Sequence, residues 1–153
     1  MTADTSIRRP SPAARRVGYG IAAAINIVLL YLVNGSPGWT AVPFLTDATS
    51  EVIPLVNASL VAGVVINLVQ LFSDPRWLVA LGGMVTTAIG SAALVRMWQV
   101  FPFDFGDTPV NWPLLVRIAL AVGLVGSLIG FVVQAVALVS SLSRPHHAAE
   151  VRR

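Results

Sequence analysis

The 153-residue chain contains no cysteine, which excludes disulfides, zinc fingers, iron–sulfur clusters and thiol nucleophiles. Charge is also scarce: 11% of the residues are charged, against about 25% in an ordinary soluble domain, while 56% are hydrophobic. Lysine is absent, so all ten basic side chains are arginine, and they outnumber the seven acidic ones. This composition excludes a disordered chain, a nucleic-acid-binding protein and a conventional soluble enzyme, and it indicates an integral membrane protein.

Catalytic and metal-binding patterns are missing as well. No Asp, Glu, Lys or His lies near the middle of any long apolar run, whereas proton relays and ion pathways usually need such groups. The two histidines, His146 and His147, lie near the C-terminus, where a solvated tail explains them better than metal or haem ligation. No Ser–His–Asp or paired-carboxylate pattern occurs in these runs. We therefore expect no enzymatic activity, no cofactor and no metal.

Four long apolar runs cover residues 17–34, 54–72, 75–100 and 113–142. Each is near or above the roughly 20 residues that a helix needs to cross about 30 Å of hydrocarbon. Backbone polar groups in lipid must be bonded within the segment, so each run predicts a helix. Asp74 before Pro75, and Asn111 before Pro113, predict N-caps for the third and fourth helices.

The predicted fold class is therefore an all-α integral membrane protein, a four-helix transmembrane bundle over residues 17–142. The segments outside the spans are the tails 1–16 and 143–153 and the outer loops 35–53 and 101–112. The tails are polar and rich in arginine, so we expect them to lie against anionic lipid; docking of a partner is the alternative.

Arginine placement predicts the orientation. Eight arginines lie on the side of the two termini: Arg8, Arg9, Arg15, Arg16, Arg76, Arg144, Arg152 and Arg153. The other side has only Arg96 and Arg117, together with Asp47, Glu51, Asp104 and Asp107. The positive-inside rule then places both termini in the cytoplasm. Because the frequent residues Arg, Ala, Val, Gly and Pro have GC-rich codons, we expect the cytoplasmic (inner) membrane of a bacterium.

The two outer loops share a spacing pattern. Trp39, Pro43-Phe44 and Pro54-Leu55 recur 59 residues later as Trp98, Pro102-Phe103 and Pro113-Leu114. A duplication would make the chain two tandem helical hairpins related by an axis along the membrane normal. Convergence is the alternative, because Trp, Pro and Phe collect at membrane interfaces in any case. Either origin predicts two similarly shaped, ordered loops.

Small and amide residues recur every four positions along the runs. The candidate helix-packing residues are Ser59, Gly63, Asn67, Gly126, Gly130 and Gln134. Residues four apart share a helix face, where small ones allow close approach and amides hydrogen-bond across helices. These faces either pack within one bundle or form an interface with another chain. A third interpretation is a polar cavity for water, a hydroxyl or a head-group, lined by Asn26, Asn67, Gln70 and Gln134.

The outer side carries a cluster of charged and aromatic residues. Its candidate members are Arg96, Arg117, Asp104, Asp107, Trp98, Trp112 and Trp39. Arg117 lies one turn into its helix, so we expect it to extend outward or to pair with a carboxylate. Arg96 is expected to pair with Asp104 or Asp107. The cluster is either an aromatic belt fastened by ion pairs or a cradle for a phosphate or carboxylate head-group.

These patterns predict a small non-enzymatic membrane protein that acts through helix association, as an accessory subunit of a membrane complex or as a homo-oligomer. The alternative function is binding or transport of a lipid or small amphiphile in the outer-face Arg/aromatic pocket. The expected partners are membrane lipids and a second copy or another membrane protein, with no nucleic acid.

Overall fold

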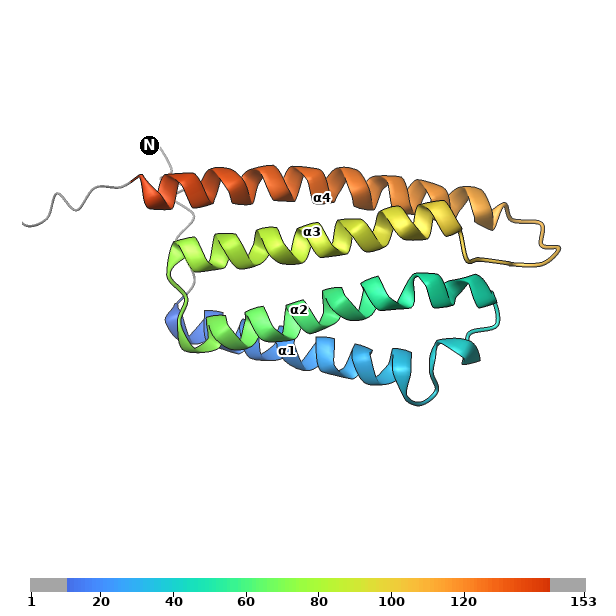
Figure 1. The fold of residues 1–153 in the computed structure, drawn as a ribbon, viewed down its shortest axis with the longest axis horizontal. Helices are drawn as coiled ribbons and strands as arrows, with labels where there is room; N and C mark the ends of the chain where they lie inside the picture. The colour runs from blue at the N-terminus through green and yellow to red at the C-terminus, as the bar shows by residue number, and fades with distance from the viewer. Residues whose placement is uncertain (1–10, 144–153) are drawn as a thin grey trace, which may run out of the picture.

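A computed structural model describes residues 11–143, which form four long helices joined by short connections (Figure 1). The helices are α1 (Pro12–Asn34), α2 (Ile53–Phe72), α3 (Arg76–Val100) and α4 (Trp112–Leu142). Two short 3-10 helices, η1 (Trp39–Ala41) and η2 (Asp47–Glu51), lie in the first connection. Each long helix is long and apolar enough to span a membrane, which confirms the all-α, multi-pass prediction. The predictions for residues 1–10 and 144–153, His146 and His147 included, lie outside the described residues.

Helices α1 and α4 begin at side-chain caps. The Ser11 hydroxyl accepts a hydrogen bond from the Ala14 amide at 3.2 Å, so α1 begins at Pro12 and includes part of the predicted tail. The Asn111 side chain accepts from the Leu114 amide at 3.1 Å, which confirms the predicted cap of α4. Each cap satisfies a backbone donor that the first turn of a helix leaves without a partner.

The predicted cap of α3 is wrong. This helix begins at Arg76, with Pro75 at the N-cap position and no side-chain capping bond. The Asp74 carboxylate instead accepts a hydrogen bond from Nε of Arg15 at 2.6 Å. Both partners of this pair are charged, and hydrogen bonds between guanidinium and carboxylate groups are among the strong ones in proteins. This ion pair joins the start of α1 to the turn between α2 and α3.

The helices pack in chain order as an antiparallel bundle that is open on one side. α1 packs on α2 and α3 packs on α4, and the two hairpins meet through α2 and α3 (Figure 1). Within residues 11–143, α1 and α4 make no contact. A two-fold axis along the membrane normal would convert the α2–α3 contact into an α4–α1 contact. The observed packing therefore lacks the symmetry that a duplication would give, which was one of the two alternatives drawn from the loop spacing.

Glycines set the closest helix contacts. A Cβ atom added at Gly63 of α2 would lie 2.9 Å from the Asn26 side chain of α1. One added at Gly83 of α3 would lie 2.8 Å from the Gln134 side chain of α4. Between the hairpins, a Cβ at Gly82 would lie 2.5 Å from Ile66. Each long side chain thus occupies space that only a glycine leaves free, as expected where lipid gives no hydrophobic drive to helix packing.

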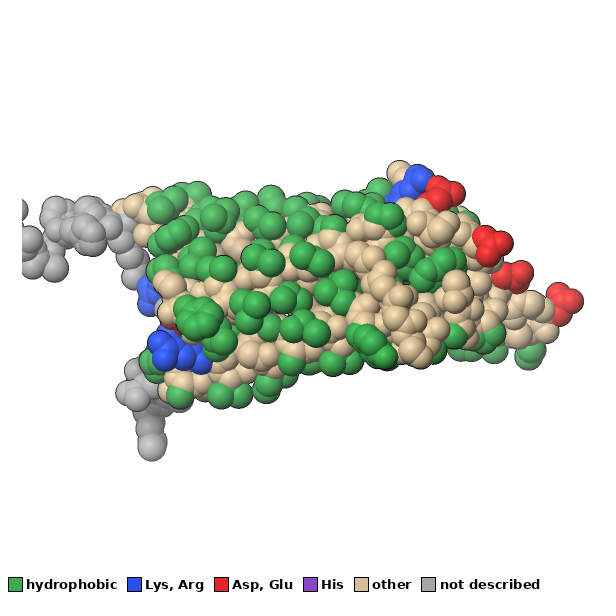
Figure 2. All heavy atoms as spheres, turned by 60° about the horizontal axis from the view of Figure 1, so that its bottom comes forward, with side chains coloured by type: hydrophobic (Ala, Val, Ile, Leu, Met, Phe, Trp, Pro, Cys, Tyr) green, Lys and Arg blue, Asp and Glu red, His purple; other side chains and the backbone are tan. Residues whose placement is uncertain are grey.

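The outer surface of the bundle matches a lipid environment. The buried hydrophobic residues of the described chain are few and mostly small: Ala23, Val52, Ala80, Ala93 and Leu120. Large aliphatic side chains instead face outward along the helices, and Figure 2 shows them covering the middle of the molecule. Most acidic side chains lie at the end opposite the chain termini, where some basic ones also lie, and other basic side chains gather at the end near the termini (Figure 2). We call the end near the termini the terminal end and the opposite one the loop end.

Replacing Gly63 with Leu is expected to lower the free energy of unfolding by roughly 1–3 kcal/mol, because the new side chain would collide with Asn26. Gly18→Leu is the matched control on α1, since nothing lies within 4 Å of a Cβ at that position. Titration of micelle-embedded protein with denaturing detergent, followed by circular dichroism, measures both variants. Equal destabilisation of the two would contradict the proposed α1–α2 contact.

Candidate functional site

The two connections at the loop end pair through their backbones. The Thr46 amide donates to the Pro102 carbonyl at 3.1 Å, and the Asp104 amide donates to the Phe44 carbonyl at 2.9 Å. Leu45 and Phe103 form an antiparallel bridge between these two bonds. The bonds join residues of the first hairpin to residues that follow α3. We call this paired segment the loop clasp, and it holds the hairpins together at the loop end.

Aromatic rings cover the loop clasp. Phe105 is central: its ring stacks on Phe44 at 5.5 Å and on Phe103 at 6.0 Å, and lies 5.9 Å from Trp112, between ring centroids. Such contacts add about 0.5–1.5 kcal/mol each beyond the area that they bury. Trp39 lies in η1, outside this set of ring contacts. The clasp is therefore rigid by virtue of both backbone bonds and aromatic packing.

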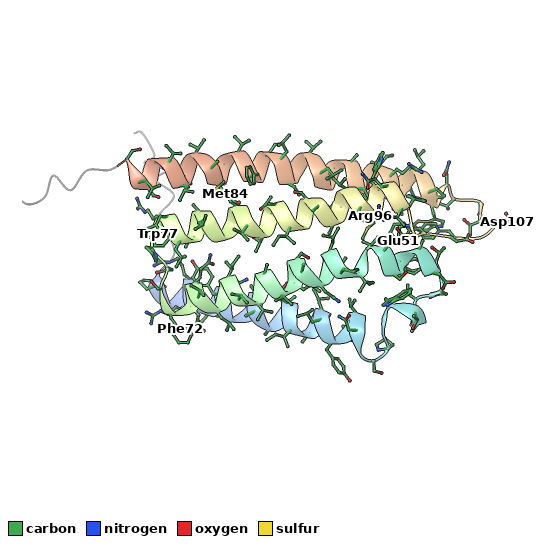
Figure 3. All side chains as sticks on the ribbon, in the orientation of Figure 1. Glu51, Phe72, Trp77, Met84, Arg96 and Asp107 are labelled. Atoms are coloured by element: carbon green, nitrogen blue, oxygen red, sulfur yellow. The ribbon has the colours of Figure 1, made fainter. Side chains whose placement is uncertain are left out.

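The two arginines of the predicted cluster have separate structural partners. Arg96 forms an ion pair with Glu51 and not with Asp104 or Asp107, so the predicted partner was wrong (Figure 3). The Arg117 guanidinium lies over two aromatic rings, 4.5 Å from the centre of Phe101 and 5.5 Å from Trp98. A cation over an aromatic face is stabilised without a carboxylate. This contact was not anticipated from the sequence.

The acidic members of the cluster lie apart from both arginines. The Asp104 side chain accepts a hydrogen bond from the Gly106 amide at 3.0 Å and so shapes the second loop. Asp107 is exposed at the tip of that loop (Figure 3). A hollow of about 580 Å³ at this end is lined by loop residues such as Phe44 and Asp104 and by Trp112 of α4, and by neither arginine. The arrangement favours a structural fastening over a head-group cradle.

The loops also differ in shape, contrary to the prediction. Residues 35–52 contain two 3-10 helices, whereas residues 101–111 contain no helix. Trp39 lies in η1, but its counterpart Trp98 lies in the last turns of α3. Helix α1 ends before Trp39, whereas α3 continues past Trp98 to Val100. The shared spacing of Trp and Pro therefore does not produce equivalent loops.

A recessed face runs along the membrane-spanning part of the bundle, over α2, α3 and α4. Its half nearer the loop end is a hollow of about 690 Å³. We call it the glycine recess, and its principal lining residues are Ser59, Thr87, Gly90, Gly126, Ser127 and Gly130. At Gly90, Gly126 and Gly130 an added Cβ would meet nothing within 4 Å. These three glycines therefore serve no close helix contact within the described chain.

The hydroxyl groups of the glycine recess differ in their hydrogen bonding. Ser59 donates to the Val56 carbonyl of its own helix at 2.8 Å. Thr87 donates to the side-chain oxygen of Gln134 at 3.3 Å. Within residues 11–143, the Ser127 hydroxyl has no hydrogen-bond partner, although it borders the same hollow. An unused donor and three open glycines thus meet on one surface of the spanning region.

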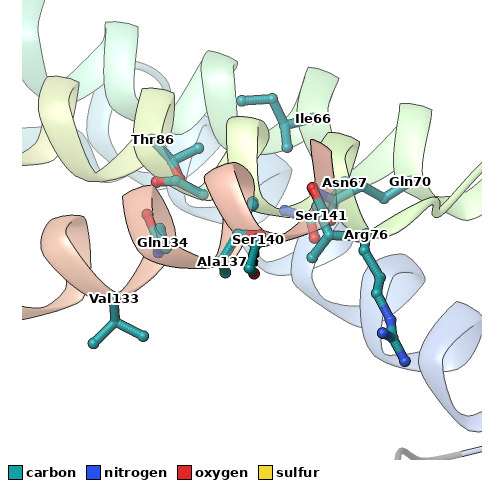
Figure 4. Close-up of a pocket in the computed structure, with 13 residues that line it drawn as sticks. Ile66, Asn67, Gln70, Arg76, Thr86, Val133, Gln134, Ala137, Ser140 and Ser141 are labelled. Atoms are coloured by element: carbon teal, nitrogen blue, oxygen red, sulfur yellow. Dashed lines mark hydrogen bonds between the residues drawn. The ribbon is translucent and has the colours of Figure 1, made fainter. Parts of the chain in front are cut away.

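The half of the recessed face nearer the terminal end is lined by more amide and charged side chains than the glycine recess. We call it the polar recess, a hollow of about 520 Å³ whose polar lining residues are Asn67, Gln70, Arg76, Thr86, Gln134, Ser140 and Ser141 (Figure 4). Thr86 borders both recesses, so the two form one continuous face. Asn67 and Thr86 donate to carbonyls of their own helices at 2.7 and 3.0 Å. The hollow therefore combines satisfied hydroxyls with amide and guanidinium donors.

The predicted helix-packing residues lie in three places: the α1–α2 contact, the glycine recess and the polar recess. Gly63 contacts α1, as the packing interpretation requires, whereas Gly126 and Gly130 remain open on the glycine recess. Asn67 and Gln134 line the polar recess together with Gln70. Asn26, predicted to join them in one cavity, instead lies between α1 and α2 and donates to the Ala22 carbonyl at 2.8 Å. The polar cavity therefore has three of its four predicted amides, and Arg76 is the member that the sequence did not indicate.

Replacement of Arg117 by Gln is expected to lower the free energy of unfolding by about 0.5–2 kcal/mol, through loss of both ring contacts. Arg117→Lys should retain part of this stability, because a cation remains over the rings. Arg96→Gln is the comparison, with a loss below about 1 kcal/mol expected for an exposed ion pair. Thermal unfolding in detergent measures all three variants; a larger effect of Arg96→Gln than of Arg117→Gln would contradict this assignment.

Comparison of the chain with known protein families, curated proteins and solved structures gave no match. The function of this small multi-pass membrane protein is therefore inferred from the geometry of its loop clasp and its recessed face.

Proposed function

We propose that this protein acts through lateral association with another membrane-protein chain, which inserts a helix into the glycine recess. The observation that carries the proposal is the set of three open glycines, Gly90, Gly126 and Gly130, on one hollow of the spanning surface. Small residues let helix backbones approach closely, and this approach is the main source of helix association in lipid. The partner is either a second copy of this chain or a different subunit.

The hydroxyl of Ser127 supports the same interpretation. It borders the recess and has no hydrogen-bond partner among the described residues. Hydrocarbon offers it none, whereas a docked helix presents backbone and side-chain acceptors. A hydrogen bond between helices contributes about 0.6–2 kcal/mol in a bilayer, so Ser127 adds to association that depends mainly on close packing.

The loop clasp fits this role as a rigid support. It joins the two hairpins at the loop end, while the Arg15–Asp74 ion pair joins α1 to the α2–α3 turn at the terminal end. The relative positions of α2, α3 and α4 are thereby fixed before a partner arrives. A preformed recess lowers the entropic cost of association.

We further propose that the protein resides in the cytoplasmic membrane of a bacterium, with the terminal end on the cytoplasmic side. The sequence supports this orientation, because eight of the ten arginines lie on the side of the termini, and Figure 2 shows most of the acidic side chains at the loop end. The positive-inside rule relates the basic end to the cytoplasm.

Gly126→Leu is expected to weaken association at least about tenfold, because the new side chain would fill the recess. The stability of the isolated chain should remain unchanged, since nothing lies within 4 Å of that position. Gly20→Leu is the matched control, as another open glycine, on α1 and away from the recess. Particle mass in mild detergent, by light scattering coupled to size-exclusion chromatography, measures assembly and distinguishes a homo-oligomer from a mixed complex.

The proposal fails if the wild-type chain is strictly monomeric under all gentle conditions. It also fails if Gly126→Leu and Gly20→Leu assemble equally. Destabilisation of the monomer by Gly126→Leu would instead assign that glycine to packing within the chain.

A further inference from the structure

The polar recess contains hydrogen-bonding groups that the chain itself does not use. The side chain of Gln70 is 93% buried, since its residue exposes only 7% of its surface. Within residues 11–143 its amide has no hydrogen-bond partner, although it borders the polar recess. The polar atoms of this amide are accessible from the hollow, so they can hydrogen-bond to a molecule that enters the recess.

Arg76 places a positive charge at the mouth of the recess. It is the first residue of α3, it is exposed, and it forms no ion pair within the described part of the chain. Figure 4 shows it at one end of the hollow, with Gln134 towards the other end. The positive end of the α3 dipole lies at the same level and favours an anion there.

The remaining lining determines the kind of anion. Thr86 lies ten residues beyond Arg76 on α3, which places it about 15 Å further into the membrane. The lining of the polar recess includes apolar side chains as well as polar ones, among them Ile66, Val79 and Val133. A small soluble anion would contact only the mouth of the polar recess, beside Arg76. A phospholipid extends along the membrane normal, with its phosphate at the interface and its esters and acyl chains below.

We propose that the polar recess binds an anionic phospholipid, whose phosphodiester pairs with Arg76. The side-chain N–H groups of Gln70 and Gln134 then donate to the deeper oxygens of the head-group and the glycerol esters. The hydroxyl oxygen of Ser141 donates its proton to the Leu138 carbonyl at 2.8 Å and can still accept from a head-group hydroxyl. The recess volume of about 520 Å³ lies in the usual range for small-molecule sites, about 300–1,000 Å³. This site adjoins the glycine recess and shares only Thr86 with it, so the binding of a lipid here does not require the proposed association.

Native mass spectrometry of the full chain, with phosphatidylglycerol and phosphatidylcholine of identical acyl chains, tests the proposal. We expect preferential retention of phosphatidylglycerol and a loss of about tenfold in Arg76→Gln. Arg16→Gln is the matched control, because Arg16 is another exposed arginine at the terminal end and does not line the recess. Gln70→Met should also lower retention, with the helical content by circular dichroism confirming that the variant is folded.

Three results would overturn the proposal: equal retention of the two lipids, equal loss in Arg76→Gln and Arg16→Gln, or displacement of phosphatidylglycerol by excess inorganic phosphate. The last would indicate a soluble anion at the mouth of the recess. If Gln70→Met does not fold, the comparison of the two arginine variants decides alone. Measurement of association in the Gly126→Leu variant is independent, so failure of either proposal is distinguishable from failure of the other.

Discussion

Close approach of helices at glycines is the constraint on which this structure depends. In lipid, burial of apolar side chains between helices gives little advantage, because the surrounding hydrocarbon is equally apolar. Contact must come from dispersion at short range and from hydrogen bonds. The Asn26 side chain against Gly63 and the Gln134 side chain against Gly83 provide that contact within each hairpin. The small number of buried large side chains follows from the same physics.

Attachment of one hairpin to the other depends on both ends of the bundle. Gly82 allows α2 and α3 to approach closely in the half of the bundle nearer the terminal end, where Ile66 and Gln70 lie against it. The Arg15–Asp74 ion pair and the loop clasp then fasten the two ends. No α1–α4 contact closes the bundle within the described chain. An open bundle with fixed ends leaves a recessed face over α2, α3 and α4, and that face holds both proposed sites.

The fold could be predicted from the sequence to the extent that it depends on local patterns. Run length and hydropathy locate the four spans, and the Asn111 cap follows from a short-range preference for that residue before a helix. Contacts between distant segments could not be predicted in this way. Arg96 pairs with Glu51, and Asp74 pairs with Arg15, because the register of one hairpin against the other decides which charges meet.

In the candidate site, too, local patterns could be predicted from the sequence, whereas contacts between distant segments could not. A four-residue spacing correctly placed Gly126 and Gly130 on one face of α4, but only the packing shows that this face lacks a neighbour. Gln70 and Gln134 were recognisable as polar residues in apolar helices. Arg76 appeared only as one basic residue beside a span, since its position at the mouth of a recess depends on how α2, α3 and α4 come together.

The most direct test of an outward-facing glycine recess is cysteine cross-linking in native membranes. The chain has no cysteine of its own, so a single Gly130→Cys variant reports one position, and Val132→Cys reports the exposed aliphatic surface of the same helix. A membrane-permeable reagent with one thiol-reactive group and one photoactivatable group needs no lysine on the partner. With this reagent, we expect Gly130→Cys to give a discrete adduct with another protein chain and Val132→Cys to give far less. Equal adducts at both positions, or none at Gly130→Cys, would contradict the account.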